Sequence, residues 1–117
     1  MTIKSKMKWV RGRLVLVDRD LAEYFQVDLK TLRVAVNRHR NHFPPDALIV
    51  FNGDETKKFD GITAEAGRRQ RRRAWGFTEL GVNLLAGLLK SDRAVAHSIE
   101  TIRKGFADFD LLRSLRL

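Results

Sequence analysis

Hydrophobic and polar positions follow a β-strand pattern in three short parts of the chain. Residues 9–17 are rich in β-branched side chains and are interrupted by Gly12, which predicts a short hairpin or a bulged strand. Residues 47–51 form an unbroken apolar run and are the clearest strand candidate. Residues 74–77 are predicted to return beside that run. The expected sheet is therefore small and antiparallel.

Apolar residues at spacings of three and four predict a pair of helices between the hairpin and the second strand. Asp18 can cap a first helix that ends before a turn at residues 26–27, and Asp28 can cap a second helix that extends to about Arg40. Prolines at positions 44–45 end this segment, because proline disfavours helical geometry in the residue before it and has no amide donor.

Two further helices are predicted in the C-terminal third. Thr78 can cap one that extends to about Leu89, and Ser91 can cap a long one. The long helix has an apolar stripe close to a heptad spacing, which fits either a dimerisation seam or packing onto the preceding helix within one domain. The stripe consists of Val95, Ile99, Ile102, Phe106, Phe109 and Leu112.

These elements predict an α+β fold class: a helix-turn-helix-like helix pair, a small antiparallel β-hairpin or sheet, and a long C-terminal helix over residues 91–117. The length of 117 residues suits one domain, residues 1–117. Residues 53–73 are polar, weakly patterned and rich in arginine at their end, so we expect a flexible basic loop there.

Charge points to the class of partner. The chain has 23 Lys and Arg against 14 Asp and Glu, and this net charge of +9 attracts polyanions. The excess lies in three clusters, at residues 4–13, 30–40 and 68–73, which is more typical of a binding surface than of general solubility. Nucleic acid is therefore the leading partner class. The N-terminal cluster is the weakest, because basic tails often fray, although one could follow a minor groove.

The second helix of the pair carries residue types that suit contact with DNA bases. Arg and Lys can reach guanine, Asn can pair with adenine, and a small apolar group can meet a thymine methyl. An ordinary helical hairpin with a solvated basic face is the alternative. In helix-turn-helix proteins the N-terminal part of the second helix reaches base edges. We predict that Lys30, Thr31, Arg33, Val34 and Asn37 lie nearest the bases, and that Arg38 and Arg40 lie nearer phosphate.

A second basic feature lies outside the helix pair. It could lay guanidinium groups on backbone phosphates beside the helix, but it could also be a disordered charged loop or a docking patch for an acidic protein. We favour phosphate contact, because another basic cluster lies on the adjacent helix pair. The residues are Arg68, Arg69, Arg71, Arg72 and Arg73.

Signals for catalysis and for cofactors are weak. The chain has no cysteine, which excludes disulfides and thiolate metal sites. His39 and His42 could share a metal ion with Asp46 nearby, but no third histidine or glutamate completes a known pattern. We expect no enzymatic activity, no metal and no cofactor, and we interpret Trp9 and Trp75 as core residues.

The chain shows no sign of export or of membrane insertion. Its apolar runs fall far short of the ~20 residues that a membrane span needs. The basic N-terminus has no apolar stretch behind it that could act as a signal peptide. We expect a soluble protein of the cytoplasm that does not bind membranes.

Residues 10–27 resemble the opening of the ORF6N domain, an Arg-Gly-containing strand followed by Asp-x-Asp-Leu-Ala-Glu and, after two hydrophobic residues, x-Val. The resemblance continues through Thr-Leu-x-x-x-Val-x-Arg at residues 31–38 and Phe-Pro-x-Asp at residues 43–46. It resumes with Phe-Thr-Glu-Leu-Gly-Val at residues 77–82 and extends to about Leu115.

This family is found in bacteria and their phages, and the resemblance implies a DNA-binding module of antirepressor-like or regulatory proteins that often carry a second domain. We therefore predict a sequence-preferring double-stranded DNA-binding protein of a bacterial host cell, either a stand-alone module or part of a longer protein. The alternative is a small phage protein that binds and inhibits a host protein through its basic surface. A nuclease subunit and an RNA-binding protein stay open as further alternatives.

Overall fold

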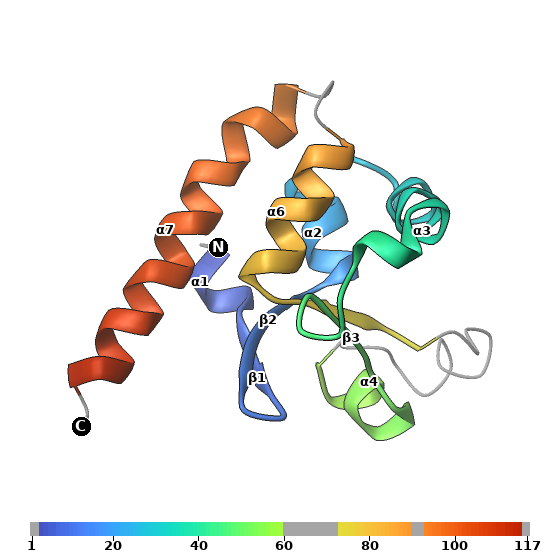
Figure 1. The fold of residues 1–117 in the computed structure, drawn as a ribbon. Helices are drawn as coiled ribbons and strands as arrows, with labels where there is room; N and C mark the ends of the chain where they lie inside the picture. Colours follow the sequence, from blue (N-terminus) through green and yellow to red (C-terminus); the bar gives the residue numbers. More distant parts are fainter. Residues whose placement is uncertain (1–2, 60–72, 90–92, 116–117) are drawn as a thin grey trace.

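A computed structural model of the chain describes residues 3–59, 73–89 and 93–115 (Figure 1). A four-stranded antiparallel sheet in the order β1-β2-β4-β3 lies among helices, which confirms the predicted α+β class. The strands are β1 (Lys8–Val10), β2 (Arg13–Val17), β3 (Leu48–Val50) and β4 (Trp75–Phe77). The helices are α1 (Ile3–Lys6), α2 (Asp18–Tyr24), α3 (Leu29–Arg38), the short 3-10 helix η1 (Arg40–His42), α4 (Gly53–Phe59), α6 (Glu79–Leu88) and α7 (Arg93–Leu115).

β1 and β2 form the hairpin that residues 9–17 predict. The two residues between the strands, Arg11 and Gly12, have positive φ angles of 53° and 78°, the combination that defines a type I′ turn. The twist of this turn matches the twist of the two strands. Glu55 on α4 accepts two hydrogen bonds from the Arg11 guanidinium, at 2.7 and 3.1 Å, and so joins the hairpin tip to α4.

β4 is the return strand that was predicted beside residues 47–51. It lies between β2 and β3, and Gly76 faces Val17 on one side and Ile49 on the other. A Cβ atom on Gly76 would come within 2.7 Å of the Phe51 ring. The close packing of this strand therefore requires a residue without a side chain.

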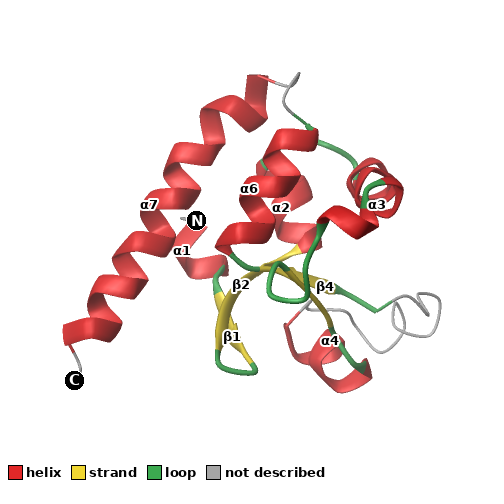
Figure 2. Ribbon diagram, viewed as in Figure 1, coloured by secondary structure: helices red, strands yellow, loops and turns green. Residues whose placement is uncertain are grey.

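The sheet separates two hydrophobic clusters. Leu14 and Leu16 of β2 belong to the larger cluster, whereas Val15 and Val17 belong to the smaller one. Because neighbouring side chains of a strand point to opposite faces, β2 is buried on both sides. Figure 2 shows α2 and α6 on one side of the sheet and α4 on the other.

Thr78 caps α6, as predicted. Its hydroxyl accepts a hydrogen bond from the Gly81 amide at 3.4 Å and donates one to the backbone carbonyl of Asp46 at 2.7 Å. Gly81 lies so close to the chain entering β3 that a Cβ atom would overlap the carbonyl oxygen of Ala47. The cap and the glycine together fix the first turn of α6 against β3.

α7 packs against the rest of the domain with the stripe that was predicted. Ile102 and Phe106 are buried, and Ile99 and Phe109 pack against the larger cluster. Packing within the domain is therefore confirmed for these four residues. The side chains at positions 95 and 112 and the predicted cap at 91 lie outside the described part of the chain. A dimerisation role for α7 stays a prediction.

The N-terminal segment is part of the core, so the expectation of a fraying basic tail was wrong for residues 3–7. Ile3 and Met7 are buried in the larger cluster, and α1 contacts α7. The terminal methyl of Met7 lies 2.8 Å from where a Cβ atom on Gly105 would be placed. Two apolar side chains, spaced one helical turn apart, anchor this segment.

The prediction of a loop over residues 53–73 was wrong for its first part, which forms α4. Asn52 and Glu55 form a reciprocal capping box: the amide of each donates to the side chain of the other, at 2.9 and 2.8 Å. Thr56 is buried, and its hydroxyl accepts a hydrogen bond from the Ala74 amide at 3.2 Å. Residues 60–72 lie outside the described ranges.

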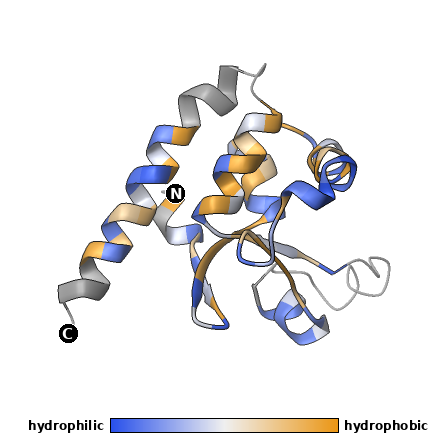
Figure 3. Cartoon of the chain, viewed as in Figure 1, coloured by the Kyte–Doolittle hydropathy of each residue, from blue (hydrophilic) through white to orange (hydrophobic). Residues whose placement is uncertain are grey.

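The hydropathy of the helices follows their position. Figure 3 shows mostly hydrophilic residues on α3 and α4 and mostly hydrophobic residues on α6. Within the described ranges, no helix has both the length and the apolar character that crossing a bilayer requires. The polar surface of α3 is the feature on which the candidate site is built.

Candidate nucleic-acid interface

α2 and α3 form the helix-turn-helix-like pair that the sequence predicts. Gln26 in the turn has a φ of 58°, in the left-handed region, and the Val27 amide donates to the carbonyl of Ala22 at 2.9 Å. Asp28 occupies the N-cap position of α3 but makes no side-chain capping hydrogen bond. In Figure 1, α3 lies on the side of the molecule away from α7.

The inner and outer sides of α3 differ in character. Leu32 and Val36 are fully buried in the larger cluster and hold the helix against α2. On α3, five of the side chains predicted to contact DNA are exposed, and we call them the reading face. They are Lys30, Thr31, Val34, Asn37 and Arg38.

Arg33 does not belong to the reading face, and its predicted contact with bases was wrong. Its side chain is only 12% exposed and forms an ion pair with Asp18 at 2.5 Å. Its guanidinium also donates to the backbone carbonyl of Arg73 at 2.9 Å and lies 4.4 Å from the ring centre of Trp75. Arg33 lies next to the buried Leu32 on α3, close enough to the core for its guanidinium to pair with the buried Asp18 carboxylate.

Asp18 is the first residue of α2, and Val17 occupies the N-cap position, so the predicted cap was wrong. The Asp18 carboxylate turns into the protein, where it is 2% exposed and accepts a hydrogen bond from the Arg19 amide at 2.9 Å. Burial raises the pKa of Asp18, and the guanidinium of Arg33 opposes that rise. The ion pair thus joins the start of α2 to the middle of α3.

Arg40 is exposed, as its predicted contact with phosphate requires. It stacks over the Trp75 ring at 5.1 Å and donates a hydrogen bond to the Asn37 side chain at 3.4 Å. Trp75 is buried, which confirms its interpretation as a core residue, whereas Trp9 on the edge strand β1 is 44% exposed and was wrongly placed in the core. The Trp75 ring therefore makes cation–π contacts with two guanidinium groups, those of Arg33 and Arg40.

The arginine run is described only at its last residue. Arg73 is exposed, and its backbone carbonyl accepts the hydrogen bond from Arg33, so the arginine run ends beside α3. Arg68, Arg69, Arg71 and Arg72 lie outside the described residues. The structure thus brings one end of the second basic feature next to the helix pair.

The histidines considered as metal ligands stack on each other, with ring centres 5.6 Å apart. In the part of the chain that the structure describes, no group of three or more His, Cys, Asp or Glu side chains could hold a metal ion.

Residues 5–88 match the family model of the ORF6N domain. This chain belongs to the ORF6N family. The matched segment of this ORF6N protein includes the hairpin, the α2–α3 pair, the sheet and α6, and it ends before α7. Comparisons with curated proteins and with solved structures found no match.

One residue of the candidate interface was not among those predicted from the sequence. Ala35 is half-buried and lines a shallow pocket on α3 together with four residues of the reading face. Ala35 could have been predicted from its position four residues after Thr31, since residues four apart share one side of a helix.

Proposed function

We propose that this ORF6N protein is a sequence-preferring double-stranded DNA-binding protein, a transcription regulator or antirepressor-like module of the phage type. The reading face carries the proposal: five exposed side chains of types that bind DNA lie on the second helix of a helix-turn-helix-like pair. α3 is a regular helix of ten residues, and a helix with its side chains is about 10–12 Å in diameter, which fits the major groove, about 12 Å wide.

Charge around α3 supports contact with DNA. The sequence has no acidic residue from position 29 to position 45, so no like charge opposes the phosphates there. Arg40 and Arg73 are exposed beside the helix, and Arg40 stacks over the buried Trp75. We propose that both contact phosphate, and that Arg68, Arg69, Arg71 and Arg72 do the same.

Binding measurements on two classes of variant test the division between base and phosphate contacts. Asn37→Ala should relax the preference at one base pair by about 1–3 kcal/mol, because the amide is suited to adenine. Arg38→Ala should weaken binding to all sequences alike and lower the log–log salt slope by about 0.9, the value for one neutralised phosphate. Fluorescence anisotropy with a selected duplex and a random duplex, at rising salt, measures both effects.

The control variant is Lys104→Ala, which removes one exposed positive charge from α7. It should leave both the preference and the salt slope close to those of the unchanged protein. Equal losses for Lys104→Ala and Arg38→Ala would mean that net charge, not α3, drives binding. A complex with a host protein that forms without DNA and persists at high salt, with no affinity for duplex DNA, would overturn the proposal in favour of the alternative function.

A further inference from the structure

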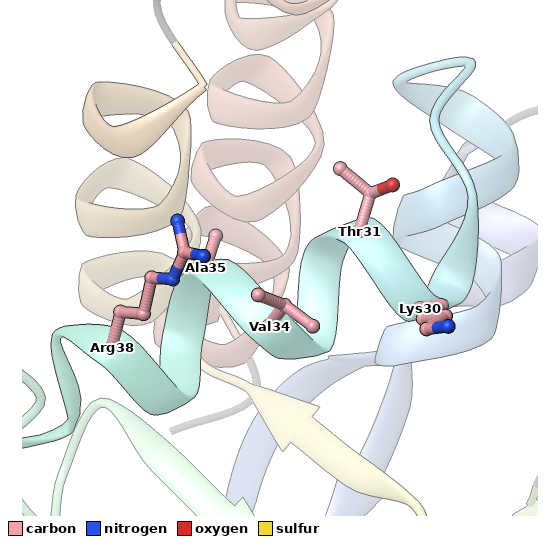
Figure 4. Close-up of a pocket in the computed structure, with 5 residues that line it drawn as sticks. All are labelled: Lys30, Thr31, Val34, Ala35 and Arg38. Carbon is pink, nitrogen blue, oxygen red and sulfur yellow. The ribbon is translucent and has the colours of Figure 1, made fainter.

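The reading face contains a shallow, largely hydrophobic depression of about 310 Å³ (Figure 4). Val34 is 39% exposed, so part of its isopropyl group faces solvent on the reading face. Thr31 and Ala35 stand beside it on the same side of α3. Together these side chains offer methyl groups, and only the Thr31 hydroxyl is polar among them.

Positive charges lie at both ends of this depression. Lys30 and Arg38 are eight residues apart, which corresponds to about 12 Å along a helix. Cations at the two ends of the depression can each reach a backbone phosphate while the methyl groups between them face the bases, which gives Lys30 a phosphate contact in place of the base contact predicted above. The matching ligand has negative charges on either side of an apolar group.

Thymine supplies that group. Among the base edges in the major groove, the thymine C5 methyl is the apolar feature, and the other groups are hydrogen-bond donors and acceptors. Val34 can satisfy neither a donor nor an acceptor, so a base pair that presents only polar groups would lose its water there without compensation.

We infer that the pocket of Lys30, Thr31, Val34, Ala35 and Arg38 recognises the 5-methyl group of a thymine, and that this contact sets part of the sequence preference. The inference rests on the proposed function and specifies it further. Val34 is the specificity-determining residue, and the two cations hold the helix at the depth that the contact requires.

Replacing one thymine of the DNA by uracil tests the inference, because this change removes only the 5-methyl group and keeps the base pair. A duplex selected by the unchanged protein is altered at one thymine at a time, and each dissociation constant is measured. At one thymine, binding should weaken about fourfold, the factor expected for exposing one methyl-sized group. At thymines that do not face Val34, the dissociation constant should not change.

The matching protein change is Val34→Ala. It should weaken binding to the thymine duplex. It should also abolish the difference in dissociation constant between thymine and uracil at the sensitive position. Val50→Ala is the control, since Val50 on β3 is similarly exposed, at 37%, but lies outside α3. It should keep the fourfold difference. Circular dichroism verifies that both variants stay folded.

The outcomes separate this inference from the proposed function. If the protein selects a sequence but replacing any thymine by uracil leaves the dissociation constant unchanged, the inferred methyl contact is wrong and the proposed DNA binding stands. The methyl contact also fails if Val34→Ala keeps the full difference. If no duplex is selected over random DNA, the proposed function itself fails, and the inference fails with it.

Discussion

The Asp18–Arg33 ion pair offers a direct test of how α3 is held in place. Arg33→Met keeps the aliphatic length of the side chain and removes its charge. Asp18, with 2% exposure, would then lose its ion-pair partner at 2.5 Å. Removing one partner of a buried pair costs about 3–5 kcal/mol, because the remaining charge is neither hydrated nor paired.

Urea unfolding measures this loss. With a slope of about 2 kcal/mol per molar urea, a loss of about 4 kcal/mol lowers the unfolding midpoint by about 2 M. Far-UV circular dichroism is the suitable probe. Trp75 fluorescence would respond to the substitution itself, because the Arg33 guanidinium lies 4.4 Å from that ring.

The loss should depend on pH with a defined sign. Burial raises the pKa of Asp18 in the folded protein above its ordinary value of 3.8, so the folded state binds this proton more tightly than the unfolded chain does. Without Arg33 the pKa rises further. The penalty of Arg33→Met is therefore largest at pH values well above the folded-state pKa, and it shrinks as pH falls toward 3.8.

Asp18→Asn removes the buried charge and supplies the control. The double variant Asp18→Asn with Arg33→Met should be more stable at neutral pH than Arg33→Met alone, since no unpaired carboxylate remains. The reasoning is refuted if Arg33→Met loses the same stability at pH 4.5 and pH 7.5, or if the two substitutions are simply additive.

Three further substitutions test the packing around α6 and α7. Gly81→Ala should cost about 3 kcal/mol in urea unfolding despite the better helix propensity of alanine, because its Cβ would overlap the Ala47 carbonyl; an unchanged midpoint would contradict this close approach. Thr78→Ala removes the cap of α6 and should cost about 1 kcal/mol by the same assay, with Thr101→Ala, at an exposed position of α7, as a control that has a smaller effect. Phe106→Ala should cost about 3–5 kcal/mol in thermal and urea unfolding, and a loss below 1 kcal/mol would mean that α7 is not part of the core.

The elements with local signals could be predicted from the sequence. The Arg11-Gly12 turn, the cap at Thr78 and the apolar run of residues 47–51 each carry their information within a few residues, and the structure confirms all three. α4 also has such a signal, the Asn52–Glu55 capping box, but the polar composition of the surrounding segment hid it.

Features that depend on distant residues could not be predicted in this way. Helical periodicity places Arg33 at the edge of the buried stripe, and only the fold shows that the Asp18 carboxylate and the Trp75 ring lie beside it. Ile3 and Met7 are too few to form a periodic pattern, so their burial against α7 is a result of tertiary packing alone. The reading face was predictable because its residues share one helix.

The strand order has a consequence for how this chain folds as it is synthesised. β4 occupies an inner position of the sheet, but Gly76 pairs with a residue about 60 positions earlier, Val17. The hairpin and the α2–α3 pair can form from local contacts while the chain is still emerging from the ribosome. Neither hydrophobic cluster can close until residues 74–77 have left the exit tunnel, so a nascent chain that pauses earlier exposes two unpaired strand edges to aggregation.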